Sequence, residues 1–141
     1  MSGASGLDDR GLPRGYSLKP EYEISPRHAK ALLDAGELVR GDVRTGEEWD
    51  LVHVPGTSHV ALSEIEKRFD EIEVPAGAMV ATLCHHGVRS LKAALALRAC
   101  GRAELAQVKS VAGGIDLWSL AADPSVPRYE RGPGVLRVTG T

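Results

Sequence analysis

Two patterns of apolar residues alternate along most of this chain. Short apolar runs, which are typical of buried strands, are followed by segments that repeat apolar residues every three or four positions, which is typical of helices. The clearest strand is residues 78–83, and the clearest helix is residues 88–100, which Gly101 ends. This alternation predicts βαβ units and therefore an α/β fold with a central, mostly parallel five-stranded sheet and helices on both faces.

The other predicted elements continue the same alternation. We expect strands at residues 22–24, 38–43, 59–61 and 108–111, and helices at residues 27–35, 45–51, 62–72 and 115–120. Ser25-Pro26 fits a helix cap followed by proline at the first helical position. Thr45 and Glu48 have the spacing of a capping box. Arg40 and Gly41 depart from the apolar residues of a buried strand, which weighs against burial of the strand at 38–43.

Composition divides the chain into three parts. Residues 1–20 are rich in Gly, Ser and Pro and have no apolar period, so we expect a flexible leader. Residues 21–130 hold the alternating elements and contain no linker, so they are expected to form one domain. Residues 131–141 follow two prolines and are expected to be an irregular C-terminal tail.

Charge and composition narrow the class of protein. Of the 141 residues, 43% are hydrophobic, and the formal net charge is −2, which argues against nucleic acid as the main partner. No apolar stretch approaches ~18 residues, so no membrane span is expected. The first residues lack the features of a secretory signal, and two cysteines do not make a disulfide framework. We therefore expect a cytoplasmic protein with reduced thiols.

The loop after the strand at 78–83 carries the candidate chemistry. It reads Cys84-His85-His86-Gly87-Val88-Arg89. Sites in parallel sheets lie at the carboxyl ends of the strands, where this loop stands. Converging backbone N–H groups and a helix amino terminus favour a thiolate on Cys84, and Arg89 can hold an oxyanion by two hydrogen bonds. The competing interpretation is that Cys84 is a small buried apolar residue.

These residues resemble the rhodanese-homology family. The string LCHHGVRS, an Ala/Leu-rich helix and then VAGGIDLW are similar to the second signature of the family, and DVRTGEEWDLVHVPGTSHV resembles the first. Both occur in order over about residues 22–130. The resemblance implies a rhodanese-like fold and a sulfurtransferase with Cys84 as nucleophile. It also implies substrate or anion binding at His85, His86, Gly87, Val88, Arg89 and Arg44.

The resemblance further implies a two-step sulfur transfer. Cys84 takes sulfur from thiosulfate or a related anionic donor, becomes a persulfide, and passes the sulfur to cyanide or a thiol, with a sulfur-relay protein as a further partner. Persulfide transfer requires no proton transfer, so we assign no such role to His85 or His86. No cofactor is expected. No metal site is expected either, because Cys84-His85-His86 is too compressed for three ligands of one ion.

Several alternatives stay open from the sequence. The domain could be a persulfide carrier that docks a partner, a cysteine phosphatase or an arsenate reductase. Related phosphatases have one more residue between Cys and Arg, so the five-position spacing of Cys84 and Arg89 favours sulfur. The other cysteine, Cys100, lies over ~20 Å from Cys84 along a helix, and we expect it to be a buried packing residue. For Arg44, a structural ion pair competes with anion binding.

Overall fold

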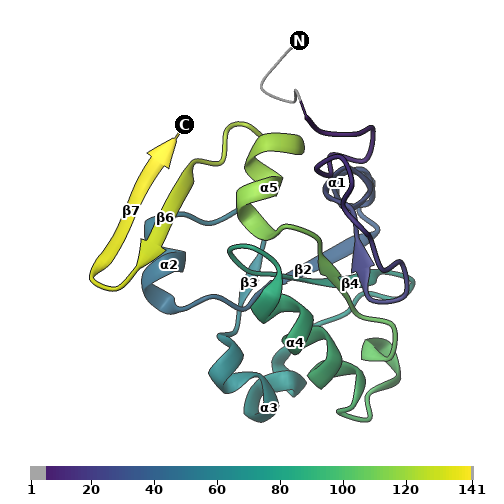
Figure 1. Ribbon diagram of the computed structural model, residues 1–141. Coiled ribbons are helices and arrows are strands. Elements are labelled where there is room, and N and C mark those ends of the chain that lie inside the picture. The colour runs from purple at the N-terminus through teal and green to yellow at the C-terminus, as the bar shows by residue number, and fades with distance from the viewer. Residues whose placement is uncertain (1–5, 141) are drawn as a thin grey trace.

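A five-stranded parallel sheet forms the centre of the computed structural model, which describes residues 6–140 (Figure 1). The strand order is β1-β5-β4-β2-β3, and every neighbouring pair is parallel. The strands are β1 (Glu23–Ile24), β2 (Leu38–Asp42), β3 (Ser58–His59), β4 (Met79–Leu83) and β5 (Lys109–Val111). The predicted α/β fold with a five-stranded sheet is confirmed.

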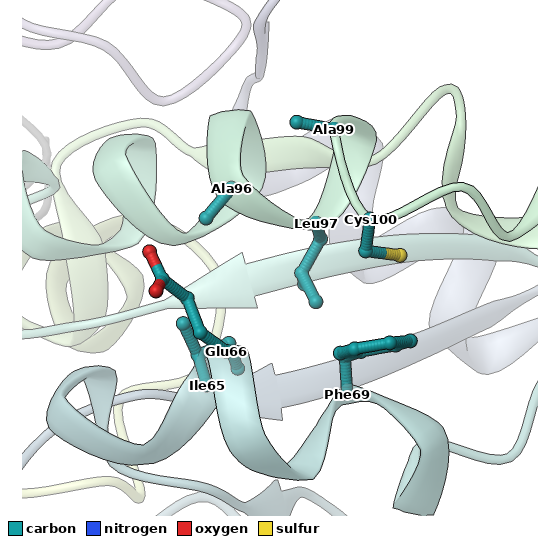
Figure 2. Close-up of a pocket in the computed structure, with 7 residues that line it drawn as sticks. All are labelled: Ile65, Glu66, Phe69, Ala96, Leu97, Ala99 and Cys100. Atoms are coloured by element: carbon teal, nitrogen blue, oxygen red, sulfur yellow. The ribbon is translucent and has the colours of Figure 1, made fainter.

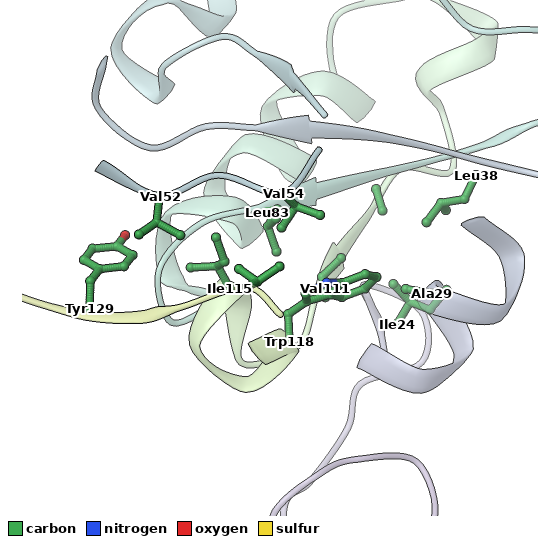
Figure 3. Close-up of a cluster of buried hydrophobic side chains, with 12 residues drawn as sticks. Ile24, Ala29, Leu38, Val52, Val54, Leu83, Val111, Ile115, Trp118 and Tyr129 are labelled. Carbon is green, nitrogen blue, oxygen red and sulfur yellow. The ribbon is translucent and has the colours of Figure 1, made fainter. Parts of the chain in front are cut away.

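Helices cover both faces of this sheet, as predicted. They are α1 (Pro26–Asp34), α2 (Gly46–Leu51), α3 (Ile65–Arg68), α4 (Val88–Arg98) and α5 (Gly114–Ala121). One apolar cluster lies under α1 and α5 and includes Ala29 and Trp118 (Figure 3). A second cluster, on the α3 and α4 side, includes Ile65 and Leu97. Within residues 6–140, no helix has the length and apolar character needed to cross a membrane.

Two helix starts form from the local signals read in the sequence. The Ser25 hydroxyl accepts the N–H of His28 at 3.4 Å, and Pro26 is the first residue of α1. Thr45 Oγ1 accepts the N–H of Glu48, and the Glu48 carboxylate accepts the N–H of Thr45, so the capping box is complete. Both predicted caps are confirmed. They could be predicted because each depends on residues at most three positions apart.

The single helix predicted at residues 62–72 is wrong. The segment consists of a 3-10 turn (Leu62–Glu64), the one-turn α3 and a second 3-10 turn (Phe69–Glu71). The Arg102 guanidinium donates to the carbonyls of Phe69 and Ile72, at 2.8 and 2.9 Å. A distant side chain thus satisfies carbonyls at the end of this segment. The periodicity of the segment could not indicate that partner.

Residues 6–20 pack on the domain, which corrects the prediction of a flexible leader for this part of the chain. Leu12 is fully buried against Ala112 and Leu117. The Arg27 guanidinium donates to the carbonyl of Asp8 at 3.0 Å. An irregular segment can bury single side chains without any repeat, so the sequence pattern carried no signal of this packing. The rest of the predicted leader, residues 1–5, lies outside the described residues.

The predicted irregular tail is a β-hairpin instead. Strand β6 (Arg128–Gly132) pairs antiparallel with β7 (Val135–Gly140), beside α2 (Figure 1). Tyr129 and Leu136 attach it to the apolar cluster under α5. An isolated two-stranded hairpin is marginally stable, so this tertiary packing accounts for an element that local pattern did not reveal. The predicted boundary at residue 130 falls inside β6.

The strand that holds Arg40 and Gly41 is buried despite these residues. Arg40 is 2% exposed, and its guanidinium lies 5.0 Å from the centre of the Trp118 ring. One terminal nitrogen donates to the carbonyl of Pro55 at 3.0 Å. Among the described residues, Nε and the other terminal nitrogen have no hydrogen-bond partner. Burial lowers the pKa of this guanidinium, so its charge is held at a cost in free energy.

Arg40→Met is expected to stabilise the protein. Methionine fills a similar volume and removes an incompletely paired buried charge, so the free energy of unfolding should rise by about 1 kcal/mol or more. Urea denaturation measures this change. Arg137→Met, at a side chain that is 73% exposed, is the control and should change stability by less than ~0.5 kcal/mol. Lower stability of Arg40→Met would show that the contacts with Trp118 and Pro55 outweigh the cost of burial.

Candidate active site

Cys84 lies at the carboxyl edge of the sheet, directly after β4. The strand register pairs Asp42 with Leu83 and Thr82 with Ser110, so the carboxyl ends of β2, β4 and β5 are neighbours. Helix α4 begins only four residues after Cys84. The cysteine therefore occupies the strand-to-helix turn predicted for it, with a side chain that is buried except for a small exposed part.

The sulfur of Cys84 is held by a backbone N–H group. The N–H of Gly87 donates to Sγ at 3.0 Å, and Sγ lies 3.3 Å from the hydroxyl of Ser90, which is 2.7 Å from that of Ser110. Gly87 has φ of +103°, a backbone conformation that side chains disfavour. The turn thus needs glycine in order to aim its N–H at the sulfur. A donor in this position stabilises negative charge on sulfur.

The next strand-to-helix turn fixes the backbone of this loop. The N–H of Ile115 donates to the carbonyl of Cys84 at 2.7 Å, and the N–H of Asp116 donates to that of His85 at 3.1 Å. A Cβ at Gly114 would lie 2.5 Å or less from both carbonyl oxygens. The close approach therefore requires glycine, and the start of α5 sets the shape of the Cys84 loop.

Arg89 is engaged by Glu48 rather than free at the loop mouth. Its two terminal nitrogens donate to the two Glu48 oxygens, at 2.6 and 2.9 Å. Glu48 is 1% exposed. Burial alone would raise the pKa of Glu48, but hydrogen bonds from Arg89 and Tyr129 outweigh that effect and lower the pKa to about 2. Glu48 is therefore a buried carboxylate at neutral pH.

Sequence reasoning missed the residues that complete this ion pair. Tyr129 donates its hydroxyl to Glu48 Oε2 at 2.5 Å, and Arg131 Nε lies 3.3 Å from Oε1. Both residues come from β6, which was not predicted. The capping box placed Glu48 at the start of a helix, but nothing in the local pattern indicated its partners 41 and 81 positions away.

Arg44 lies in a buried ion pair and not at the mouth of the loop, which corrects its inclusion among the anion-binding residues. Its side chain and that of Asp42 are both inaccessible, and their shortest N–O distance is 2.7 Å. Arg44 also donates to the carbonyl of Val52 at 2.6 Å and to the hydroxyl of Tyr129 at 3.2 Å. These contacts match the alternative of a structural ion pair.

The remaining loop residues divide between the interior and the surface. His85 is buried, and its ring stacks between those of His86 and Tyr129, at centroid distances of 3.9 and 4.1 Å. Its Nε2 lies 3.0 Å from the carbonyl oxygen of Tyr129. Burial, with a contribution from His86, lowers the pKa of His85. The side chains of His86 and Val88 are exposed. The loop thus has an inner histidine and an outer rim.

One group of potential metal ligands comes together within residues 6–140. His85, His86 and Asp116 offer ligand atoms within 4.8 Å of one another. The Asp116 carboxylate already accepts two hydrogen bonds from Arg128, at 2.8 and 3.1 Å. His85 Nε2 faces the Tyr129 carbonyl. Two of the three groups therefore have other partners.

The second cysteine lies far from this chemistry. Cys100 follows the last turn of α4, whereas Cys84 precedes its first turn. It lines a mainly apolar groove between α3 and α4, opposite Phe69 (Figure 2). Both cysteines are free thiols. This position agrees with the packing role expected for Cys100.

The buried Glu48 carboxylate predicts a pH dependence of stability. Because its pKa falls from 4.5 to about 2 on folding, Glu48 contributes stability that is fully present above pH 4.5 and is lost as the pH falls towards 2. Glu48→Gln should therefore be less stable than the wild type at pH 7, by roughly 3 kcal/mol. This difference should shrink between pH 4.5 and 2.

Urea denaturation over that pH range tests this expectation. Glu47→Gln removes the same charge from the exposed neighbouring position, and its difference from the wild type should stay small throughout. A Glu48→Gln difference that does not change with pH would contradict the charged state assigned to Glu48.

Comparison with known proteins identifies relatives over most of the domain. The family model described as the rhodanese-like domain matches residues 25–121. The probable adenylyltransferase/sulfurtransferase MoeZ of Mycobacterium tuberculosis is 31% identical over 107 residues, which cover 75% of this chain and 26% of that protein. The putative sulfur carrier protein YrkF of Bacillus subtilis is 36% identical over 80 residues, covering 56% and 42%. The chain thus spans about a quarter to two fifths of these two relatives.

Solved structures share the fold. A rhodanese-like domain protein from Staphylococcus aureus has a TM-score of 0.61 at 23% identity, covering 77% of this chain and 99% of that one. The human single-domain sulfurtransferase TSTD1 has a TM-score of 0.58 at 24% identity, covering 72% and 96%. These likenesses confirm the rhodanese-like fold expected from the two signatures. Together with the match of the family model over more than half of the chain, they show that this protein belongs to the rhodanese-like domain family.

Proposed function

We propose that this protein is a sulfurtransferase that carries sulfane sulfur as a persulfide on Cys84. The donor is thiosulfate or a related anion, and the acceptor is cyanide or a thiol. The observation that carries this proposal is the Gly87 N–H held 3.0 Å from Cys84 Sγ. That N–H group stabilises the Cys84 thiolate that attacks the sulfur donor and that is restored when the acceptor removes the sulfur.

The reaction proceeds in two displacements at sulfur. The Cys84 thiolate attacks the outer sulfur of thiosulfate, a new S–S bond forms, and the S–S bond of the donor breaks. Sulfite leaves with the electron pair of that bond. Cyanide then attacks the outer sulfur of the persulfide and leaves as thiocyanate, and the Cys84 thiolate is restored. Each step conserves electrons and needs no external oxidant or reductant.

Neither displacement requires a proton to be moved by a side chain. The Cys84 thiolate and cyanide attack as anions, and sulfite and the restored thiolate leave as anions. The lowered pKa of His85 keeps its imidazole neutral at pH 7, and Nε2 faces a backbone carbonyl. The sequence assigned His85 no proton-transfer role. Its burial against Tyr129 favours support of the loop backbone over the anion binding that the family resemblance implied.

The balance of charge near the loop favours an anionic donor. Arg89 and Arg131 share the single negative charge of Glu48. The charge of Arg44 is matched by that of Asp42. Among these five side chains, positive charges exceed negative ones by one before Cys84 ionises. The Arg89 and Arg131 side chains are 20% and 48% exposed, so their charge acts on an approaching anion.

Relatives support a place in sulfur metabolism but not a single donor. One is named as an adenylyltransferase/sulfurtransferase and another as a sulfur carrier. A partner protein could therefore supply or accept the sulfur on Cys84. A reduced cytoplasm would suit either role because the nucleophile must be a free thiol. The experiment below separates the small-molecule donor from the protein donor.

Intact-mass spectrometry tests the persulfide on Cys84. After incubation with thiosulfate, wild-type protein should gain one sulfur, about 32 Da, because sulfur transfers to the thiolate. Addition of cyanide should remove this mass and release thiocyanate. Cys84→Ser should gain no sulfur. Cys100→Ser is the matched control, and it should behave as the wild type does.

The outcomes separate three readings. Sulfur gained equally by Cys84→Ser would contradict Cys84 as the carrier. No gain by wild type from thiosulfate, followed by a gain from a cysteine desulfurase and cysteine, would make the protein a carrier supplied by another protein. No gain from either donor would exclude the proposed function.

A further inference from the structure

The β6–β7 hairpin reaches the active site through Tyr129. This residue is 3% exposed and lies beside Val52 in the apolar cluster (Figure 3). Its hydroxyl donates to Glu48 at 2.5 Å and accepts from Arg44 at 3.2 Å. Its ring stacks on that of His85, and its carbonyl oxygen lies 3.0 Å from Nε2 of His85. One residue from outside the family-matched span, 25–121, thus contacts α2 and the Cys84 loop together.

The Tyr129 hydroxyl fixes the orientation of the Glu48 carboxylate. Oε1 accepts from Arg89 and from the capping residue Thr45 and lies 3.3 Å from Arg131 Nε, whereas Oε2 accepts from Arg89 and Tyr129. Among residues 6–140, Oε2 therefore has two partners, Arg89 and the Tyr129 hydroxyl. Without the hydroxyl, Oε2 keeps only its bond from Arg89, so the carboxylate and the guanidinium can turn together about the contacts on Oε1.

The orientation of Glu48 decides that of Arg89. Both terminal nitrogens of Arg89 bind the carboxylate, so the guanidinium plane follows the carboxylate plane. Arg89 lies in the first turn of α4, two residues after Gly87, whose N–H donates to Cys84 Sγ at 3.0 Å. A rotation of the Glu48 carboxylate would therefore move a positive charge relative to the reactive sulfur.

We propose that Tyr129 is a positioning residue that fixes the Glu48–Arg89 pair and thereby the recognition of the anionic sulfur donor. It touches neither the donor nor the sulfur. The identity of that donor as thiosulfate rests on the proposed function, but the effect of Tyr129 on anions near Cys84 does not.

Packing alone does not account for the hydroxyl. Phenylalanine would fill the same space against Val52 and His85. The hydroxyl instead lies between a buried carboxylate and a buried guanidinium, and it donates to one and accepts from the other. Tyr129→Phe therefore separates the positioning role from the packing role.

The experiment compares anionic and neutral reagents at Cys84. Wild type, Tyr129→Phe and the hairpin control Arg137→Met are labelled with iodoacetate and with iodoacetamide, and the rates are followed by intact mass. The ratio of the iodoacetate rate to the iodoacetamide rate should be higher for wild-type protein than for free cysteine. The iodoacetate-to-iodoacetamide ratio should fall about fivefold in Tyr129→Phe, the effect of one hydrogen bond, and stay unchanged in Arg137→Met. General loosening of the fold would change both rates alike.

Steady-state kinetics give a second readout. In Tyr129→Phe the KM for thiosulfate should rise about fivefold while kcat changes less than twofold, because donor binding and not sulfur chemistry is altered. Tyr129→His keeps a ring and an N–H donor, so its labelling ratio should lie nearer to that of wild type. If Tyr129→Phe does not fold, Tyr129→Met replaces it, because methionine also lacks the hydroxyl and adapts to irregular core space. A fivefold fall in its ratio would then support the proposal, and an unchanged ratio would overturn it.

The failure of this proposal is distinct from that of the proposed function. An unchanged labelling ratio in folded Tyr129→Phe would overturn the positioning role, even if wild type transfers sulfur. A fivefold fall in the ratio would support the role, even if wild type does not use thiosulfate. Equal discrimination by wild type and free cysteine, or no labelling of Cys84, would contradict it, since no anion recognition would exist to be positioned.

Discussion

The carboxylate of Glu48 is buried and charged, and donors from three parts of the chain surround it. Thr45 belongs to the turn before α2, Arg89 to the start of α4, and Tyr129 to the C-terminal hairpin. A buried charge is tolerated only where such partners replace its water. The same contacts therefore join α2, the Cys84 loop and β6. The placement of all three depends on the ionised state of one side chain.

The candidate active site combines this charged cluster with a neutral set of backbone donors. The Gly87 N–H acts on the sulfur directly, and the turn before α5 holds the loop through the carbonyls of Cys84 and His85. Backbone donors do not titrate, so the Gly87 N–H stays directed at the sulfur at any pH at which the fold persists. In the proposed reaction, Arg89 and Arg131 act at longer range on the approach of the anionic donor. Stabilisation of charge and attraction of the donor thus come from different parts of the structure.

Much of the fold was predictable because its signals are local. The apolar runs of the strands, the caps at Ser25 and Thr45 and the glycines near Cys84 act over a few residues. The predictions for the helix at 62–72, for residues 6–20 and for the C-terminal tail were wrong for one shared reason. Each is shaped by distant contacts, such as those of Arg102 with Phe69 and of Leu12 with Leu117, which periodicity does not record.

The sequence by itself determined the α/β architecture, the family signatures and the position of Cys84 between a buried strand and a helix. It also determined the five-residue spacing to Arg89, since spacing is a property of the chain alone. Only the tertiary structure decided where the charges lie. In the fold, Arg44 pairs with Asp42, Arg89 pairs with Glu48, and the Tyr129 hydroxyl contacts Arg44 and Glu48. The partner of a buried charge depends on proximity in space and not on distance along the chain.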